Sequence, residues 1–226
     1  MSRGKSIFIT GTGTDIGKTY VTGLIVKKLR ESGFNAGYYK AAVSGVEEGQ
    51  LSDPAYVKKI AGIDDNNPPK AVSYVYKEAV SPHLAARINN RPIDFNVIEQ
   101  DFQKARNYYD FLTVEGSGGI ICPIRWDNSK HLIIDEMINR LKLSVLIISP
   151  AGLGSINAAV LTIEHLQNRQ IPIKGIILNH WHSNNIMEED NAYMIEKITG
   201  IPILTRVREN DDNLDIEADY LAKLYE

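Results

Sequence analysis

The sequence contains very little cysteine, because Cys122 is the only one in 226 residues. One thiol cannot pair within the chain, so an internal disulfide framework is excluded and a reducing compartment is indicated. No histidine or other base signature stands near Cys122 in the sequence. A small apolar core residue is therefore the favoured interpretation, rather than a catalytic thiol.

Long hydrophobic runs, repeats and an excess of one charge are also missing. No apolar run approaches the roughly 20 residues that span a bilayer, and no signal sequence precedes the first apolar segment, which begins after Lys5. The 25 basic and 28 acidic residues nearly balance, which indicates neither a nucleic-acid surface nor a membrane surface. We therefore expect a cytoplasmic protein without a membrane or nucleic-acid partner.

The strongest motif is a loop of glycine and threonine, Gly11 to Thr19, between a strand pattern and a helix pattern. Backbone N–H groups of such a loop, the start of the next helix and Lys18 bind a polyphosphate, and the Thr19 hydroxyl binds Mg²⁺. Five residues separate Gly11 from Gly17, whereas the common pattern has four. The alternative, a glycine turn that caps a helix and leaves Lys18 solvated, fits the flanking strand and helix less well. The loop predicts binding of a nucleoside triphosphate.

Charged residues also stand where other strand patterns end. Lys40 ends a strand at about 36–40, and Glu115 follows the buried-strand pattern at 111–114 and precedes a glycine loop. Open α/β sheets bind ligands at the carboxyl ends of their strands, so we expect Lys40 beside the loop of the first strand. A buried Glu115 needs a metal or a lysine to compensate its charge, which favours an Mg²⁺ contact. Asp53, at the start of a helix pattern, is either a cap or a site residue.

Strand and helix patterns alternate along the chain, and no linker separates them. This alternation predicts a single α/β domain over residues 1–226, with a P-loop NTPase-like, mostly parallel sheet and helices on both faces. We expect strands at about 7–9, 36–40, 72–76, 111–114, 145–148, 173–178 and 203–207, and helices from 20, at 53–61, from 81, at 96–107, 130–141 and 155–168, around 193–198 and from 215.

Several segments together resemble dethiobiotin synthetases, from residue 6 to about residue 204. Members of that family use ATP, Mg²⁺ and CO₂ to close a ureido ring on 7,8-diaminononanoate (7,8-diaminopelargonate) in biotin synthesis. The resemblance implies a carbamate and a carbamic–phosphoric anhydride as intermediates, with ADP and phosphate released. The segments are Gly11 to Thr19, Tyr39-Lys40 through Ser44-Gly45, Ser52-Asp53, Ser81 to Ala86, Val114 to Gly119 with Pro123, and Gly152 to Asn157.

The resemblance also implies roles for individual residues. The expected catalytic residues are Lys18, Lys40, Thr14 and Ser44, with the lysines on the phosphates and the hydroxyls by the carbamate. The expected Mg²⁺ contacts are Thr19, Asp53 and Glu115. The residues expected to bind the nucleotide are Gly13, Thr14, Asp15, Ile16, Gly17, Lys18, Thr19, Tyr20, Asp53, Glu115, Gly118 and Asn179, of which Asn179 matches the family's adenine-reading asparagine.

In that family the substrate carboxylate is held across a dimer interface. The resemblance therefore implies a homodimer with shared sites, in which Tyr193 and the backbone from Leu153 to Asn157 come from the second subunit. The alternative for Tyr193 is a packing residue of an amphipathic helix. The expected substrate-binding residues are Ser44, Gly152, Leu153, Gly154, Asn157 and Tyr193.

Departures from the family leave part of the prediction open. Asp15 replaces a common glutamate, and residues 205–208 replace a stretch that usually contains glycine and proline, so base selectivity is not predicted. A partner-switch ATPase of the partitioning or division-site type would carry an extra lysine early in the loop, where none stands. An amidating synthetase would need an added glutaminase domain. A non-catalytic nucleotide-binding protein would not need Lys40 and Glu115 together with the loop.

Overall fold

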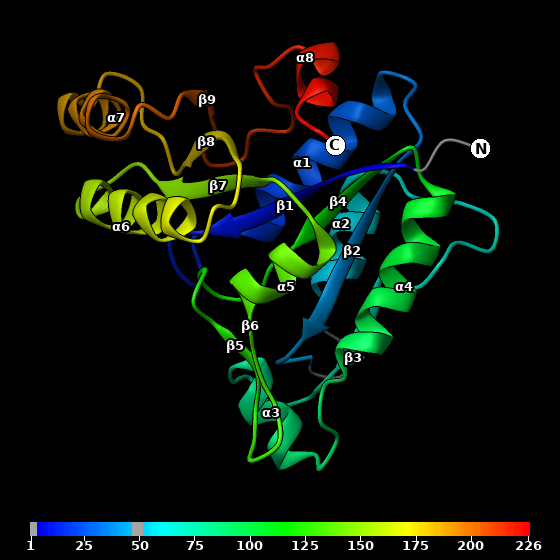
Figure 1. Cartoon of the computed structure of the whole chain (residues 1–226). Helices are drawn as coiled ribbons and strands as arrows, with labels where there is room; N and C mark the ends of the chain where they lie inside the picture. The colour runs from blue at the N-terminus through cyan, green and yellow to red at the C-terminus, as the bar shows by residue number, and fades with distance from the viewer. Residues whose placement is uncertain (1–3, 47–51) are drawn as a thin grey trace.

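The computed structural model describes residues 4–46 and 52–226. Seven of its strands form a parallel sheet in the order β3-β2-β4-β1-β7-β8-β9, and β5 and β6 form a separate antiparallel hairpin (Figure 1). The strands are β1 (Lys5–Gly11), β2 (Ala36–Val43), β3 (Val72–Val75), β4 (Phe111–Glu115), β5 (Pro123–Trp126), β6 (His131–Ile133), β7 (Val145–Pro150), β8 (Ile173–Asn179) and β9 (Ile203–Arg206).

Helices cover both faces of the sheet, as expected. Residues of α1, α2 and α8 share one hydrophobic core with the sheet, and residues of α3 to α7 share the other. Within the two described ranges, no helix is long and apolar enough to cross a membrane. The helices are α1 (Lys18–Glu31), α2 (Asp53–Ile60), α3 (Pro82–Ile88), α4 (Phe95–Tyr108), α5 (Ile134–Leu141), α6 (Ser155–Asn168), α7 (Ile186–Thr199) and α8 (Ala218–Lys223).

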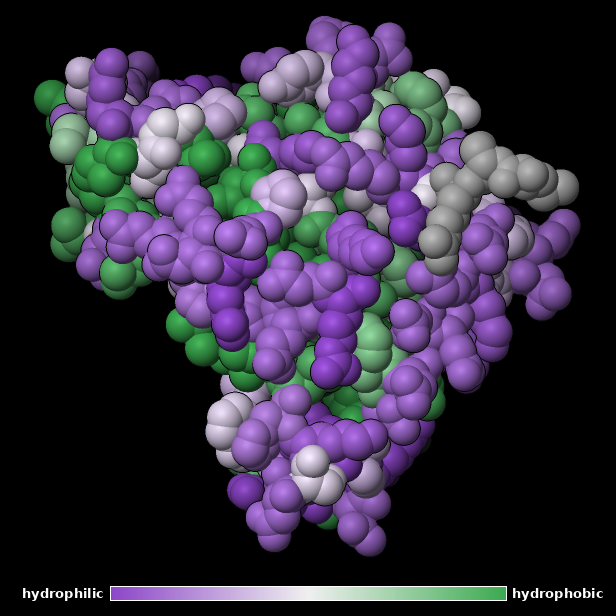
Figure 2. Space-filling view, in the orientation of Figure 1, coloured by the Kyte–Doolittle hydropathy of each residue, from purple (hydrophilic) through white to green (hydrophobic). Residues whose placement is uncertain are grey.

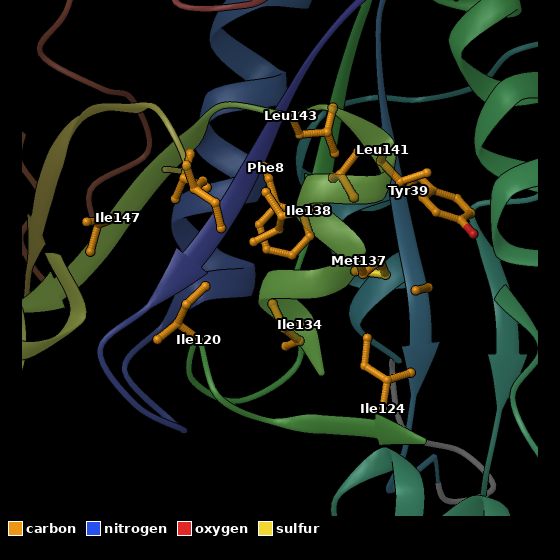
Figure 3. Close-up of a cluster of buried hydrophobic side chains, with 14 of the residues drawn as sticks. Phe8, Tyr39, Ile120, Ile124, Ile134, Met137, Ile138, Leu141, Leu143 and Ile147 are labelled. Atoms are coloured by element: carbon orange, nitrogen blue, oxygen red, sulfur yellow. The ribbon is translucent and has the colours of Figure 1, made fainter. Parts of the chain in front are cut away.

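The strand β1 shows how the sequence divides these two cores. Its side chains alternate, so that Ile7 and Ile9 enter the core with α1 while Phe8 enters the opposite core, and all three are fully buried. Figure 3 shows Phe8 beside α5, which contributes Ile134 and Ile138 to the same cluster. Full burial of each such side chain contributes about 1.5–3 kcal/mol. The sheet that carries the phosphate loop is therefore held rigidly from both sides.

Three strand ends meet at one edge of the sheet and position the polar residues discussed below. In the sheet register, Glu115 of β4 lies opposite Ile9 of β1 on one side and opposite Lys40 of β2 on the other. Although β4 separates β2 from β1, Lys40 lies beside the loop of the first strand as expected, because it lines one cavity with the loop residues. Glu115 is the residue next to the phosphate loop, and Lys40 reaches the same place across it.

The hairpin formed by β5 and β6 is the element that the sequence patterns did not predict. The helix expected at about 130–141 begins only at Ile134, because residues 131–133 pair with β5. The helix expected from about 215 begins at Ala218. The strands of the main sheet lie where they were predicted, with bounds that differ by a few residues.

Candidate active site

The loop between β1 and α1 has the backbone form that a phosphate-binding loop needs. Asp15 and Gly17 have positive φ angles of 57° and 82°, so successive N–H groups turn toward the start of α1. A Cβ on Gly17 would lie 2.2 Å from Nδ2 of Asn179, which leaves space only for glycine. The Asn179 amide donates a hydrogen bond to the carbonyl oxygen of Ile16 at 2.9 Å. Asn179 thus braces the loop from the end of β8.

Lys18, the first residue of α1, lies folded over this loop. Its Nζ donates to the carbonyl oxygen of Gly13 at 2.6 Å, and the residue is 7% exposed. Burial lowers the pKa of Lys18, although the nearby Glu115 carboxylate acts in the opposite direction. A buried ammonium at a helix N-terminus gains stability when an anion approaches, because both the helix dipole and the charge favour a negative group.

Behind the loop, Glu115 lies at the centre of a chain of charged contacts. Its Oε1 accepts hydrogen bonds from the Thr19 hydroxyl at 2.8 Å and from Nζ of Lys40 at 2.7 Å. Lys40 also donates to Oδ2 of Asp53 at 2.5 Å. Burial alone would lower the pKa of Lys40, but the carboxylates of Glu115 and Asp53 outweigh it and raise the pKa. Asp53 is therefore a member of this charge cluster and not only a residue of the first helical turn.

The sequence reasoning missed Tyr38, which completes the coordination of this carboxylate. The Tyr38 hydroxyl donates to Oε2 of Glu115 at 3.1 Å, and the residue is buried. Burial, reinforced by the charge of Glu115, raises the pKa of Tyr38 well above its ordinary value, so the hydroxyl keeps its proton. Tyr38 and Lys40 are two residues apart on β2 and share one face. This two-residue spacing was the sequence feature that could have linked Tyr38 to Lys40. That both contact Glu115 follows only from the register of β2 on β4.

A cavity of about 480 Å³ opens over the loop and this charge cluster. It brings together most of the residues predicted for the nucleotide and for catalysis. Gly13 and Ile16 belong to the loop but do not line the cavity, and neither does Asn179, whose amide is bonded to Ile16. The Tyr20 hydroxyl points elsewhere, to the carbonyl of Asp211. Ser117, not predicted as a site residue, also lines it. The lining residues are Thr14, Asp15, Gly17, Lys18, Thr19, Lys40, Val43, Ser44, Asp53, Glu115, Ser117 and Gly118.

The donor set in this cavity fits Mg²⁺. Thr19, Asp53 and Glu115 offer one hydroxyl and two carboxylates, which are the hard oxygen ligands that this ion prefers. Among residues 4–46 and 52–226, no three histidine, cysteine, aspartate or glutamate side chains converge as a metal cluster. Mg²⁺ does not require one, because it is usually held by one or two carboxylates, substrate phosphates and water.

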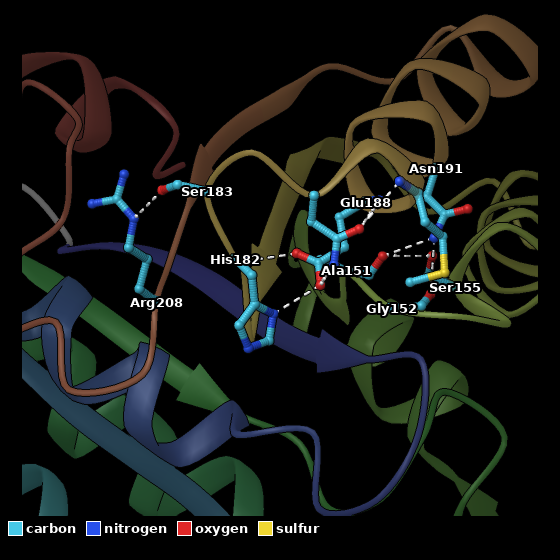
Figure 4. Close-up of polar contacts among 10 residues, drawn as sticks. Ala151, Gly152, Ser155, His182, Ser183, Glu188, Asn191 and Arg208 are labelled. Atoms are coloured by element: carbon cyan, nitrogen blue, oxygen red, sulfur yellow. Dashed lines mark hydrogen bonds and ion pairs between the residues drawn. The ribbon is translucent and has the colours of Figure 1, made fainter.

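The residues predicted to hold the substrate carboxylate do not line this cavity. Gly152 and Gly154 lie in the loop before α6, where Asn191 of α7 donates to the carbonyl oxygens of Ala151 at 2.9 Å and of Gly152 at 3.0 Å (Figure 4). Asn157 lies in the first turn of α6. These contacts fix the loop against α7.

Two of those predicted residues face outward. Leu153 is 91% exposed and Tyr193 on α7 is 57% exposed. Tyr193 is thus not a core residue, and its ring lies under the ammonium of Lys197, 5.4 Å from the ring centre. The structure places this predicted group on the surface of α6 and α7, apart from the cavity of the same chain.

The parallel sheet, the glycine loop and the lysine at the start of α1 define the chain as a P-loop NTPase. Two solved structures share the fold. The MinC:MinD cell division protein complex of Aquifex aeolicus matches with a TM-score of 0.58 and 16% identity over 97% of this chain and 86% of that one. A ParA family ATPase from Chlorobium tepidum TLS matches with a TM-score of 0.56 and 16% identity over 92% and 86%. At such identities the likeness concerns the fold alone.

Sequence comparison identifies the family within the P-loop NTPases to which the chain belongs. A family model described as an AAA domain matches residues 5–215. The ATP-dependent dethiobiotin synthetase BioD of Clostridium botulinum (strain Eklund 17B / Type B) is 46% identical over 226 residues, 98% of either chain. That of Brachyspira hyodysenteriae (strain ATCC 49526 / WA1) is 48% identical over 211 residues, 93% of this chain and 95% of that one. The chain belongs to the ATP-dependent dethiobiotin synthetase family, which confirms the resemblance seen in its motifs.

Proposed function

We propose that this protein makes dethiobiotin from 7,8-diaminononanoate, CO₂ and ATP, as an enzyme of biotin synthesis. The observation that carries the proposal is the convergence of Lys18, Lys40 and Glu115 on one phosphate-loop cavity, in a chain that is 46% identical to a dethiobiotin synthetase along its length. A partner-switch ATPase of the same fold would carry an extra lysine early in its loop, where this chain has Thr12, Gly13 and Thr14. ATP is a co-substrate and is converted to ADP and phosphate.

The proposed reaction has three bond-forming steps. One amine nitrogen of the diamine attacks CO₂ and loses a proton, which gives a carbamate. A carbamate oxygen then attacks the γ-phosphorus, the bond to the β–γ bridging oxygen breaks, and ADP leaves. The second amine attacks the carbonyl carbon of the resulting carbamic–phosphoric anhydride. The bond between that carbon and the phosphate oxygen breaks, the amine nitrogen loses a proton to the departing phosphate or to water, the ureido ring closes, and inorganic phosphate is released.

Phosphoryl transfer of this kind depends on position and charge more than on a strong base. Lys18 and Lys40 supply positive charge where the β- and γ-phosphates would lie, and one such contact is typically worth about 3 kcal/mol in the transition state. Thr14 and Ser44 line the same cavity, and in the proposed reaction they contact carbamate and phosphate oxygens. In the ligand-free structure the Ser44 hydroxyl donates to the carbonyl oxygen of Val80 at 2.6 Å. Mg²⁺, held by Thr19 with the two carboxylates of the cluster, would supply further neutralisation of phosphate charge.

Oxygen-18 labelling tests the proposed chemistry. With ¹⁸O-labelled bicarbonate, kept from exchange by a short reaction time, one labelled oxygen is expected in each phosphate released and one in the ureido carbonyl. This follows because the carbamate oxygen that attacks phosphorus remains on it when the ring closes. Phosphate without label would exclude attack by the carbamate. Lys18→Ala serves as the control, since it should release no phosphate above background.

We further propose that the active unit is a homodimer with the substrate site shared between subunits. The predicted carboxylate loop lies outside the cavity of its own chain, and it leads into the N-terminus of α6, a position that suits a carboxylate. Figure 2 shows hydrophobic residues gathered over α6 and α7. A surface of this kind fits a second copy of the chain. The exposed apolar residues there are Leu153, Leu161, Ile186, Met187, Tyr193 and Ile198.

Mixing two inactive or impaired variants tests the shared site. In a heterodimer of Tyr193→Phe and Lys18→Ala subunits, one site carries both substitutions and the other carries neither. At diamine concentrations below the wild-type KM, the mixture should exceed the summed activity of the separate variants. Tyr193→Phe alone should raise the KM for the diamine and leave ATP binding nearly unchanged, because only the remote carboxylate loses a contact. A monomeric active enzyme, or no gain after demonstrated subunit exchange, would rule out sharing.

A further inference from the structure

A second cavity, of about 770 Å³, lies between α3 and the β5–β6 hairpin. Its volume is in the range of small-molecule sites. The two elements form the lower end of the molecule in Figure 1, and the same end is mostly hydrophilic on the face drawn in Figure 2. None of its lining residues is among those proposed for ATP or the diamine. The lining residues that matter here are His83, Arg87, Arg125, Trp126, Asp127 and His131.

On the hairpin side of this cavity, Arg125 and Asp127 form an ion pair, and both side chains are hydrogen-bonded within the protein. Arg125 donates from Nε to Oδ2 of Asp127 at 2.5 Å and from Nη1 to the carbonyl oxygen of Ile93 at 3.0 Å. The other carboxylate oxygen of Asp127 accepts from the backbone N–H of Ser129 at 2.8 Å and of Lys130 at 2.9 Å. The negative charge of Asp127 is thus neutralised inside the hairpin and does not repel an anion in the cavity.

The opposite wall, on α3, carries cationic and donor groups that remain available. His83 and Arg87 are four residues apart and share one face of the helix. Nδ1 of His83 contacts the hydroxyl of Ser81 at 3.0 Å, whereas Nε2 has no partner among the described residues. Throughout the part of the chain that the structure describes, the Arg87 guanidinium has neither a hydrogen bond nor an ion pair. The uncommitted charge of the cavity is therefore positive.

The hairpin contributes a flat apolar surface to the cavity, in addition to the polar groups of α3. Trp126 of β5 pairs with His131 of β6 in the register, and their rings stack with centroids 4.1 Å apart and planes 18° apart. The stack holds the indole in place while Trp126 remains 54% exposed. A fixed, exposed indole face favours a flat ring as its partner.

We propose that this cavity binds a small organic anion that carries a flat ring. Arg87 and His83 hold the anionic group, and the ring stacks on the Trp126–His131 pair. A bidentate guanidinium contact suits a carboxylate or a phosphate monoester. This site is independent of the phosphate loop and of the proposed reaction.

Isothermal titration of the full chain with phenyl phosphate tests the site, with saturating MgADP present to occupy the phosphate loop. Phenyl phosphate carries both recognised groups, whereas inorganic phosphate lacks the ring and phenol lacks the charge. We expect phenyl phosphate to bind at least tenfold more tightly than either. Benzoate has the same ring with a carboxylate in place of the phosphate. Tighter binding of benzoate than of phenyl phosphate would indicate a carboxylate ligand, and the reverse would indicate a phosphate ligand.

Matched variants locate the binding. Arg87→Ala and Trp126→Ala should each weaken phenyl phosphate binding about tenfold or more, because a charge-assisted contact or the stacking surface is lost. Arg140→Ala, which removes an arginine outside the cavity, should leave it unchanged, as should Lys18→Ala titrated without nucleotide. Absence of binding at millimolar phenyl phosphate, or equal affinity in wild type and Arg87→Ala, would overturn the proposal. Circular dichroism of each variant confirms that it is folded.

Discussion

Replacement of Lys40 by methionine is expected to lower the free energy of unfolding of the ligand-free protein by about 3–5 kcal/mol. The side chains of Lys40 and Glu115 are 6% and 0% exposed, and Nζ lies 2.7 Å from Oε1. Methionine keeps the length of the side chain but removes the ammonium. Among the described residues, Glu115 then retains only hydroxyl donors, from Thr19 and Tyr38. Removal of one member of a buried ion pair costs about that much because the other charge is left uncompensated. Asp53, 38% exposed on its side chain, adds little since water screens it.

Urea unfolding followed by circular dichroism measures this effect in four proteins: wild type, Lys40→Met, Glu115→Gln and the double variant. Each single substitution leaves an uncompensated buried group, whereas the double variant leaves neither charge. We therefore expect the double variant to lose less stability than the sum of the single losses, by about 1–3 kcal/mol. A Lys40→Met protein as stable as wild type, or losses that simply add, would refute the inferred role of this buried pair.

Three further substitutions test other parts of the structure. Tyr38→Phe removes the donor to Oε2 of Glu115 and should raise the Mg²⁺ concentration for half-maximal activity several-fold; an unchanged Mg²⁺ titration would contradict this role. Gly17→Ala should abolish ATP binding in equilibrium dialysis while the protein stays folded, because a Cβ would lie 2.2 Å from the Asn179 amide at a φ of 82°; wild-type affinity would show that the loop adapts. Burial raises the pKa of Tyr76 to about 12, so its neutral phenol contributes stability that is present below pH 10 and lost as the pH rises through 12. Tyr76→Phe should flatten the fall of Tm between pH 10 and 12, and an identical fall would refute the assignment.

Local sequence predicted the main sheet because its central strands are buried on both faces and consist of short apolar runs bounded by polar loops. The β5–β6 hairpin has no such run. β5 is only four residues long and β6 only three, and they pair from Pro123 and Ile133 to Trp126 and His131 across a polar turn. The apolar spacing of α5 extended the helix prediction back over β6. Pairing across this short turn, and not the apolar spacing of the segment that follows, decided the structure of this region.

The phosphate loop was predictable because its function depends on a contiguous segment of the chain. The surroundings of Glu115 were only partly predictable, since they depend on strand order. Placement of β4 between β1 and β2 brings Lys40 and Tyr38 to one carboxylate, and no local pattern in β2 specifies that order. For the same reason, Tyr38 was not recognised as a partner of Glu115.

Product formation by the purified protein tests the proposed function most directly. The protein is supplied with ATP, Mg²⁺, bicarbonate and 7,8-diaminononanoate, and dethiobiotin is followed by mass spectrometry while phosphate release is measured in parallel. The proposed function predicts one dethiobiotin and one phosphate for each ATP consumed, and only background phosphate when the diamine is omitted. Phosphate release at the same rate with and without the diamine, with no dethiobiotin formed, would contradict it.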